Sequence, residues 1–353
     1  MAGSVTKKCP SCGAYLEYQP GKAVLRCPYC GTEVSIDSAA PAPQSPAADG
    51  TRDTQTAAEA VSEAKGFHGY HCQNCGAEVV TGPTTAATRC YFCHSPITLT
   101  DRLSGSFQPN QLVPFSLGQE EAKKVFQNWI RGKRFVDGRF LTEDQLSLFS
   151  GVYYPYWLGE VRGTTSFSGK GTVVSTSTIG SNVTTTTSYY DVRRETSNRF
   201  TGLVRKALRR VDSSLSDGIQ PYRFGEAKSY DPGYLSGFLA EIRDVPMEEV
   251  REDFVRSCTT RAVNEIQEMR GMTTLKGQAQ FRTSEVRMNY ALMPAWVLTY
   301  KSEKRKPYYF MMNGQTGKIY GRLPVKRSKL FIVSALLGAL VFGLLCAGGA
   351  FLW

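Results

Sequence analysis

The segment CPSCGAYLEYQPGKAVLRCPYCG, from Cys9 to Gly31, contains two CxxC pairs separated by fourteen residues. The same arrangement returns 63 residues later, from Cys72 to Cys93, again with fourteen residues between the pairs. Two copies of one CxxC-x14-CxxC module are an internal repeat. The repeat predicts two small units that are built in the same way.

The spacing of these cysteines is typical of a metal site with four thiolate ligands. Two CxxC turns together complete a tetrahedral shell with metal–sulfur distances of about 2.3 Å. Because four protein ligands leave no open position, we expect one structural Zn²⁺ in each module. The predicted ligands are Cys9, Cys12, Cys27 and Cys30 in the first module and Cys72, Cys75, Cys90 and Cys93 in the second. A rubredoxin-type iron site uses the same ligands, and His71 or His94 replacing a cysteine is a less favoured alternative.

The end of the chain is apolar. Leu330 to Trp353 reads LFIVSALLGALVFGLLCAGGAFLW and contains no charged residue. At a rise of about 1.5 Å per residue this segment exceeds the roughly 30 Å thickness of the bilayer core. The sequence therefore predicts one C-terminal transmembrane helix over residues 330–353, and no signal peptide is expected at the N-terminus.

The formal charge of +11 is unevenly distributed. Residues 1–100 carry seven Lys and Arg against eight Asp and Glu, a balance of −1, whereas residues 301–353 carry nine against one, a balance of +8. The positive-inside rule then predicts a single-pass protein of the cell membrane with its N-terminal part in the cytoplasm, where disulfides are not expected. The residues expected to face anionic lipid headgroups are Lys318, Arg322, Lys326, Arg327 and Lys329.

Composition divides the rest of the chain into segments. Residues 38–66 are rich in Ala, Pro, Ser and Thr and contain no aromatic residue, so we expect a disordered linker here. Such a linker would let the two cysteine modules, which we call zinc ribbons, move independently. The predicted domains are zinc ribbon 1 over residues 1–37, this linker, zinc ribbon 2 over 67–100, and a cytoplasmic α+β domain over 101–325.

The α+β domain shows both helical and strand periodicity. Ala122, Phe126 and Ile130 share one helical face, and a second helix is expected from Pro246 to Met269 with Cys258 in its core-facing stripe. Strands are predicted at Val152–Val161, Gly163–Ser175, Val183–Arg193, Asn198–Leu208, Tyr290–Tyr300 and Pro307–Met312. Pro155 and Pro294, each two residues before a Trp, mark either two related strands or, as we favour, two edge strands where proline is tolerated. The predicted fold class is two small zinc ribbons plus an α+β domain with mainly antiparallel sheet, followed by one C-terminal transmembrane helix.

No enzyme motif was found in the chain. It lacks a P-loop, a GxGxxG, an HExxH and a GxSxG sequence. All three histidines, His68, His71 and His94, lie beside the second module, so the α+β domain lacks the commonest acid–base group. We therefore expect a protein without catalytic activity.

Several motifs together resemble a known family. They are the paired CPxCG-like ribbons, LVPF at 112–115, GVYYPYW at 151–157, DPGYLSGF at 231–238 and MNGQTGK at 312–318, followed by the apolar end. In these motifs the chain resembles bacterial membrane proteins with a TFIIB-type zinc ribbon, over nearly its whole length. The resemblance implies a cytoplasmic zinc-ribbon protein that docks soluble partners at the membrane, in some cases within envelope-stress systems. The duplicated ribbon and His94 after Cys93 depart from that pattern.

The expected function is that of a membrane-anchored adaptor, which recruits protein partners to the inner face of the membrane. The alternative is a membrane-tethered nucleic-acid-binding protein. Phosphate contacts need a basic surface, whereas residues 1–100 sum to −1 and four thiolates on Zn²⁺ add about −2 per site. Further expected partners are anionic lipid headgroups and a second copy of the apolar helix, which would pack through the small residues Ala335, Ala339, Gly343 and Ala347.

Overall fold

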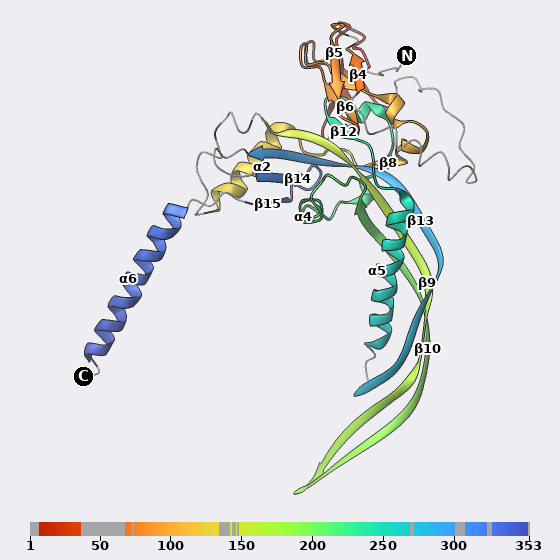
Figure 1. Ribbon diagram of the computed structural model, residues 1–353, viewed down its shortest axis with the longest axis vertical. Helices are drawn as coiled ribbons and strands as arrows, with labels where there is room; N and C mark the ends of the chain where they lie inside the picture. The colour runs from red at the N-terminus through yellow and green to blue at the C-terminus, as the bar shows by residue number, and fades with distance from the viewer. Residues whose placement is uncertain are drawn as a thin grey trace.

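The computed structural model describes residues 7–36, 68–72, 74–133, 142, 146, 148–268, 272–300, 308–322 and 327–351. One ten-stranded sheet dominates these residues, and a three-stranded and a two-stranded sheet accompany it (Figure 1). The predicted linker, residues 38–66, lies outside the described residues.

The two small sheets belong to the cysteine modules. The three-stranded sheet consists of β1 (Glu17–Gln19), β2 (Val24–Arg26) and β3 (Glu33–Ser35), and the two-stranded sheet of β4 (His68–His71) and β5 (Glu78–Thr81). The large sheet contains β6 (Thr85–Arg89), β7 (Pro96–Thr98), β8 (Gln111–Leu112), β9 (Ser150–Ile179), β10 (Asn182–Lys206), β11 (Lys228–Ser229), β12 (Leu239–Glu241), β13 (Thr274–Tyr300), β14 (Tyr308–Asn313) and β15 (Ile319–Gly321). The α-helices are α2 (Gln119–Arg131), α4 (Ser213–Gly218), α5 (Met247–Gln267) and α6 (Arg327–Phe351).

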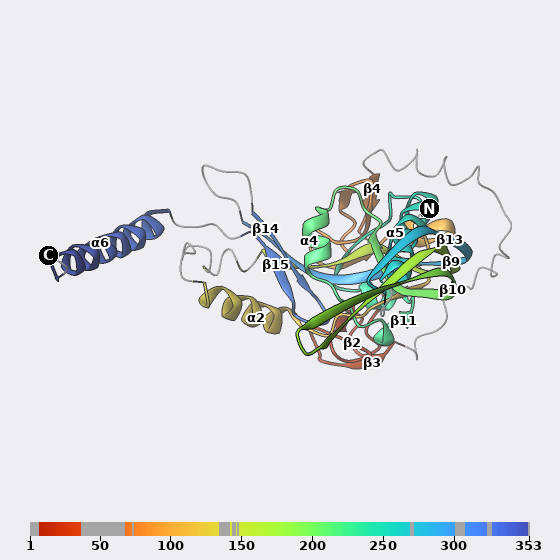
Figure 2. The ribbon, with the colours of Figure 1, turned by 90° about the horizontal axis from the view of Figure 1, so that it is seen from below.

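Three long strands form an arm that leaves the rest of the sheet. β9 lies between β13 and β10 and pairs antiparallel with both (Figures 1 and 2). At about 3.3 Å per residue, the thirty residues of β9 reach about 100 Å. Each of β9 and β10 was predicted as two shorter strands, and the structure joins them because the polar and glycine positions between them continue the ladder.

The glycines of the arm allow close packing rather than turns. A Cβ atom at Gly169 would lie 2.3 Å from the carbonyl oxygen of Lys276, and one at Gly277 would lie 2.6 Å from the Phe167 ring. Gly169 and Gly277 are paired across the two strands, and the buried Phe167 ring covers them. An aromatic side chain thus fills the space that two missing side chains leave.

Helix α5 lies along the inner side of the curved arm (Figure 1). Its buried residues are Val250, Phe254, Cys258, Ala262 and Ile266. The Phe254 ring lies against Gly159 of β9, where a Cβ atom would be only 2.5 Å from the ring. Burial raises the pKa of the Cys258 thiol, which packs in the core as predicted.

The two prolines predicted to mark edge strands lie inside the sheet instead. Pro155 lies where β9 changes its neighbour from β12 at Tyr153 to β10 at Tyr156. Pro294 lies where β13 changes from β8 at Leu292 to β14 at Ala295. At both positions the strand is between two neighbours on the side where the neighbour changes, so no backbone N–H is needed there for a hydrogen bond to a paired strand. A proline, which has no N–H group, therefore fits an interior strand at these positions.

The predicted membrane segment is corrected by the structure. Among the residues that the structure describes, no helix has the length and apolar character needed to cross a membrane. Helix α6, Arg327–Phe351, covers the predicted segment as far as residue 351. The predicted transmembrane helix over 330–353 and the membrane localisation are therefore wrong, and the fold class is corrected accordingly.

Candidate metal centres and the ribbon dock

The four CxxC turns share one backbone geometry. In each turn the residue after the second cysteine donates its N–H to the carbonyl of the first cysteine, over distances of 2.8 to 3.0 Å. The donating residue has a positive φ in every turn: 73° at Gly13, 74° at Gly31, 76° at Gly76 and 56° at His94. The motif that departs from Cys-Gly thus adopts the same turn, because His94 takes the left-handed conformation that glycine takes elsewhere.

The turns bring the eight cysteines into two groups. The Sγ–Sγ distances are 3.5 Å for Cys9–Cys30 and Cys12–Cys27, 3.6 Å for Cys72–Cys93 and 3.7 Å for Cys75–Cys90. A tetrahedron with metal–sulfur bonds of about 2.3 Å has edges of about 3.8 Å, whereas a disulfide bond is about 2.05 Å.

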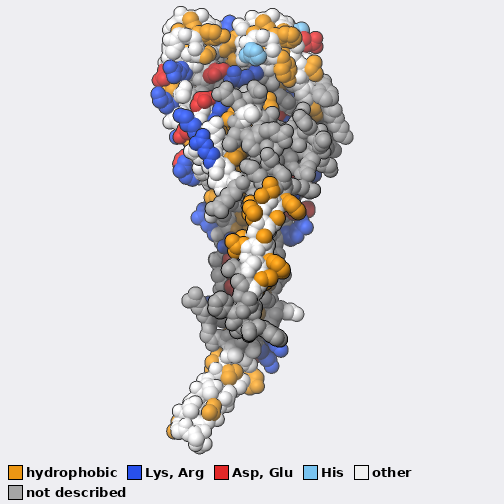
Figure 3. Space-filling view, turned by 90° about the vertical axis from the view of Figure 1, so that its left-hand side faces the viewer, with side chains coloured by type: hydrophobic (Ala, Val, Ile, Leu, Met, Phe, Trp, Pro, Cys, Tyr) orange, Lys and Arg blue, Asp and Glu red, His pale blue; other side chains and the backbone are white. Residues whose placement is uncertain are grey.

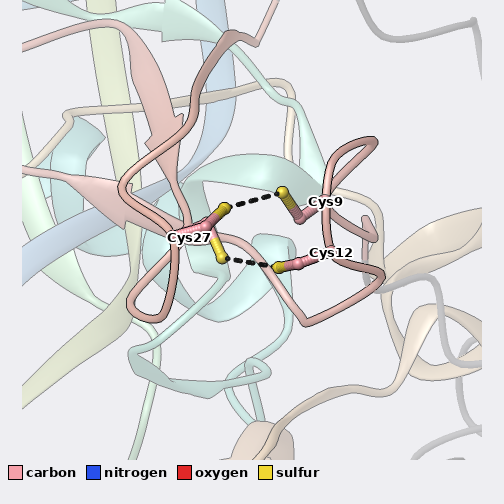
Figure 4. Close-up of side chains that lie close together, drawn as sticks. Cys9, Cys12 and Cys27 are labelled. Atoms are coloured by element: carbon pink, nitrogen blue, oxygen red, sulfur yellow. Dashed lines mark hydrogen bonds between the residues drawn. The ribbon is translucent and has the colours of Figure 1, made fainter.

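Figure 4 shows Cys9 and Cys12 on one loop pointing toward Cys27 on the other. Within each group all four sulfurs lie within 4.8 Å of one another, and no histidine belongs to either group. The two predicted ligand sets are therefore the two groups of the structure that could each hold a metal ion.

Hydroxyl groups lie beside the last thiol of each group. The Thr32 hydroxyl is 3.1 Å from the Cys30 sulfur, and this hydrogen bond is the largest cause that lowers the pKa of Cys30 to about 6. The Ser95 hydroxyl is 3.3 Å from Cys93 and is likewise the largest cause that lowers the pKa of Cys93 to about 5. These contacts favour the thiolate form, which is the form that binds metal.

The first ribbon is fixed to the body through Tyr18 on β1. Its hydroxyl donates to the Phe115 carbonyl at 3.2 Å, and its backbone N–H donates to the Ser236 carbonyl at 3.0 Å. The Ser236 hydroxyl returns a hydrogen bond to the Leu16 carbonyl. Leu16 and Tyr18 are buried in the same hydrophobic cluster as the body, so this ribbon is part of the main core.

The segment Asp231–Phe238 is the receiving side of this dock. Its first turn is fixed by Asp231, whose carboxylate accepts the Gly233 N–H at 2.6 Å, and residues Pro232–Leu235 form a 3₁₀ turn. The Tyr234 ring lies 5.1 Å from the Tyr18 ring, centroid to centroid. This motif was noted in the sequence through a family resemblance alone, and the structure gives it a role.

Aromatic residues of three motifs of the resemblance, together with Trp296, meet around Phe115. The centroid of its ring is 4.3 Å from Phe238, 5.0 Å from Tyr153 and 5.1 Å from Trp296. The Phe115 N–H also donates to the Tyr153 hydroxyl at 3.3 Å. Three motifs far apart in the sequence therefore form one aromatic cluster beneath the first ribbon.

The second ribbon is fixed through the backbone instead. Its strand β6 pairs antiparallel with β12 at Ala87 and Ala240, and β12 in turn pairs parallel with β9. The Ile242 N–H donates to the Thr84 carbonyl at 2.7 Å, and the Thr84 hydroxyl donates to Glu241 at 2.6 Å. The hairpin β6–β7 thus belongs to the ten-stranded sheet.

Arg89 on β6 connects both ribbons with the body. Its guanidinium lies 3.0 Å from the Glu17 carboxylate of the first ribbon and donates to the Gly237 carbonyl at 2.8 Å. The expectation that the ribbons move independently is therefore replaced by two ribbons held on one body.

A cavity of about 510 Å³ lies beside this junction. Its wall includes Tyr18, Arg89, Gln119, Phe238 and Trp296, which come from separate segments of the chain. Sequence reasoning missed this cavity because no local pattern joins residues that meet only through the tertiary fold.

The second CxxC turn of each ribbon carries exposed aromatic side chains between its cysteines. Tyr29 is 82% exposed, and Tyr91 and Phe92 are 69% and 71% exposed. Hydrophobic side chains also gather at the upper end of Figure 3, which is the end that carries β4 and β5 in Figure 1. The metal turns therefore present large apolar side chains to the surroundings.

The basic residues predicted to face lipid do not form a described cluster. The Lys318 amino group donates to the Gln220 carbonyl, and Arg322 is exposed. Lys326 and the side chains of Arg327 and Lys329 lie outside the described part of the chain. The predicted lipid-facing role depended on the membrane helix and is withdrawn with it.

A comparison with known proteins finds a relative that matches most of the chain. The chain is 28% identical over 330 residues to the Uncharacterized protein YdjG of Bacillus subtilis (strain 168), a match that covers 92% of each chain. No family model matches the chain. No solved structure matches it either. The resemblance to proteins with a TFIIB-type zinc ribbon stays a prediction.

Proposed function

We propose that this protein is a zinc-ribbon adaptor that binds protein partners through the tips of its two ribbons. Each cysteine group holds one structural Zn²⁺, and such binding stabilises a small ribbon by about 10–16 kcal/mol near neutral pH. The observation that carries the proposal is the exposure of Tyr29, Tyr91 and Phe92 on the metal turns.

Exposed aromatic side chains at these positions favour a binding role. Tyr and Phe are enriched at protein interfaces, where a few buried aromatic anchors supply most of the binding energy. The metal and the shared turn geometry hold Tyr29, Tyr91 and Phe92 in place, so a partner meets pre-organised anchors and little ordering entropy is lost. The docking of both ribbons on the body adds to this pre-organisation.

Charge argues for proteins rather than nucleic acid as the partners. Residues 1–100 carry a formal charge of −1, and each four-thiolate zinc site adds about −2. Nucleic-acid binding depends on Lys and Arg neutralising phosphates, and this part of the chain has no excess of either. The resemblance to proteins that dock partners supports the same conclusion.

The test compares zinc-loaded full chain with a variant carrying Tyr29→Ser, Tyr91→Ser and Phe92→Ser. The matched control is Tyr309→Ser, which removes an exposed tyrosine of β14 away from the ribbons. In crosslinking from cell extract, we expect the wild type and the control to bind the same proteins. The amount of these proteins bound to the triple variant should be lower by about tenfold or more, because the loss of about 1.4 kcal/mol of binding energy lowers the affinity tenfold.

Two results would contradict the proposal. One is the same set of proteins, in the same amounts, bound to the triple variant with its zinc content unchanged. The other is sub-micromolar binding of DNA or RNA at physiological salt, which would identify the ribbons as a nucleic-acid module instead.

A further inference from the structure

We propose that the tip of the arm, Val173–Tyr190, pairs edge to edge with the tip of a second copy of this chain. The tip is the end of the β9–β10 hairpin, and it extends beyond the start of β13. β13 begins at Thr274, opposite Thr172, so the part of β9 beyond this point has β10 on one side and no described strand on the other.

The backbone groups of β9 that point to the open edge can be identified from its last contacts with Thr273, the residue just before β13. The Thr273 N–H donates to the Thr172 carbonyl at 2.7 Å, and the Val174 N–H donates to the Thr273 hydroxyl at 2.9 Å. Because successive residues of a strand point their N–H and C=O groups to opposite edges, Thr176 and Thr178 point theirs to this same open edge. Within the described residues these groups meet no strand.

The tip carries none of the usual protection of an open edge. No charged residue and no proline occurs from Gly171 to Tyr190, whereas charges return on β10 directly after it, at Asp191, Arg193, Arg194, Glu195 and Arg199. At the bottom of Figure 3 the tip accordingly shows white and orange side chains without red or blue. Proteins protect open strand edges with charges and prolines, so an edge without them is suited to pairing with another strand.

The tip also exposes large apolar side chains. Ile179 is 82% exposed, Val183 65% and Tyr189 79%, although all lie in or beside strands. An isolated two-stranded hairpin is marginally stable in water, and a third strand with an apolar face is usually needed. A strand added at the position that β13 leaves vacant would continue the three-stranded arm.

The most suitable occupant is the same tip of a second copy. A tip without charges offers no charge pattern to select a different partner, and two identical tips do not repel each other. In a two-fold, antiparallel arrangement centred on Ser177, Thr176 of one copy pairs with Thr178 of the other, and both residues already direct their backbone groups to that edge. The two arms then approach from opposite directions, which keeps the bodies apart.

The test removes the donor at the open edge without touching the hairpin ladder. Thr176→Pro deletes an N–H group that points away from β10, and proline is tolerated on such an edge. Its matched control is Thr185→Pro, because Thr185 is the β10 residue paired with Thr176 and its N–H points to the outer edge of β10. The readout is the mass of the zinc-loaded full chain by light scattering, in a mild non-ionic detergent that covers the exposed apolar residues of α6.

We expect two chains per particle for the wild type and Thr185→Pro, and one chain for Thr176→Pro. Hydrogen exchange at Thr176 and Thr178 should be about tenfold slower or more in concentrated wild type than after dilution, because only pairing protects these amides. The pair Thr176→Lys and Thr185→Lys repeats the comparison with a charge in place of a proline. A wild type with one chain per particle at high concentration would overturn the proposal. So would a loss of pairing in the Thr185 variants as well as in the Thr176 variants, with both proline and lysine.

Discussion

The two ribbons have the same cysteine spacing and the same sulfur geometry, yet they join the body in different ways. The first ribbon is attached by side chains, above all by Tyr18, which reaches the Phe115 carbonyl. The second is attached by its backbone, because β6 continues the large sheet through β12. One module thus supports two kinds of attachment.

The residues between the cysteines account for the difference. With the 63-residue offset of the repeat, Tyr18 corresponds to Thr81, so the second ribbon lacks the docking tyrosine. It has instead the small residues Ala86 and Ala87 on β6, both buried, where a neighbouring strand can approach closely. The cysteine spacing determines the metal site, whereas the intervening side chains determine how the ribbon meets the body.

The largest difference between the two ribbons is expected when one cysteine ligand is removed from each of them in turn. Cys27→Ser and Cys90→Ser each remove a metal contribution of about 10–16 kcal/mol, which is comparable with the whole stability of a domain, about 5–15 kcal/mol. We expect Cys27→Ser to abolish hydrogen-exchange protection in β1, β2 and β3 alone. Cys90→Ser should abolish it in β6 and β7 and weaken it strongly in β12, because β12 would keep β9 but lose β6, the other of its two neighbours.

Each variant is the control for the other, because Cys27→Ser leaves the second ribbon intact and Cys90→Ser leaves the first ribbon intact. Equal loss of protection in β12 for both variants would contradict the difference in attachment. So would full protection of β12 in Cys90→Ser.

A smaller effect is expected at the side-chain dock. Tyr18→Ala removes a buried ring and its hydrogen bond, and truncation of a buried aromatic costs about 3–5 kcal/mol. Tyr18→Phe keeps the ring and loses only the hydroxyl contact to Phe115, which costs about 1 kcal/mol. Urea unfolding of the zinc-loaded chain measures both differences, and an Ala variant no less stable than the Phe variant would exclude the ring as the main anchor.

Local sequence patterns predicted the elements whose cause is local. The cysteine groups follow from spacing alone, and α2 and α5 follow from an apolar stripe of helical period that packs against the sheet. The long strands were predicted too short, and the first of them was divided directly before Gly163. The role of this glycine appears only when the opposite strand is known, since a Cβ atom at Gly163 would lie 2.4 Å from the Arg282 carbonyl.

Contacts between distant segments were beyond sequence reasoning. Nothing in the sequence connects Tyr18 with Ser236 or Ala87 with Ala240, so the ribbons were predicted to be independent. The prolines at 155 and 294 were interpreted as edge markers because their neighbours were unknown. The apolar end forms helix α6, but no helix among the described residues combines the length and the apolar character needed to cross a membrane.

The central claim is that two four-cysteine zinc sites hold the two ribbons on one body. Metal analysis of the purified full chain tests it most directly. The account predicts two zinc ions per chain for the wild type and one each for Cys27→Ser and Cys90→Ser. A chain that contains no metal, or that contains iron in place of zinc, would contradict it.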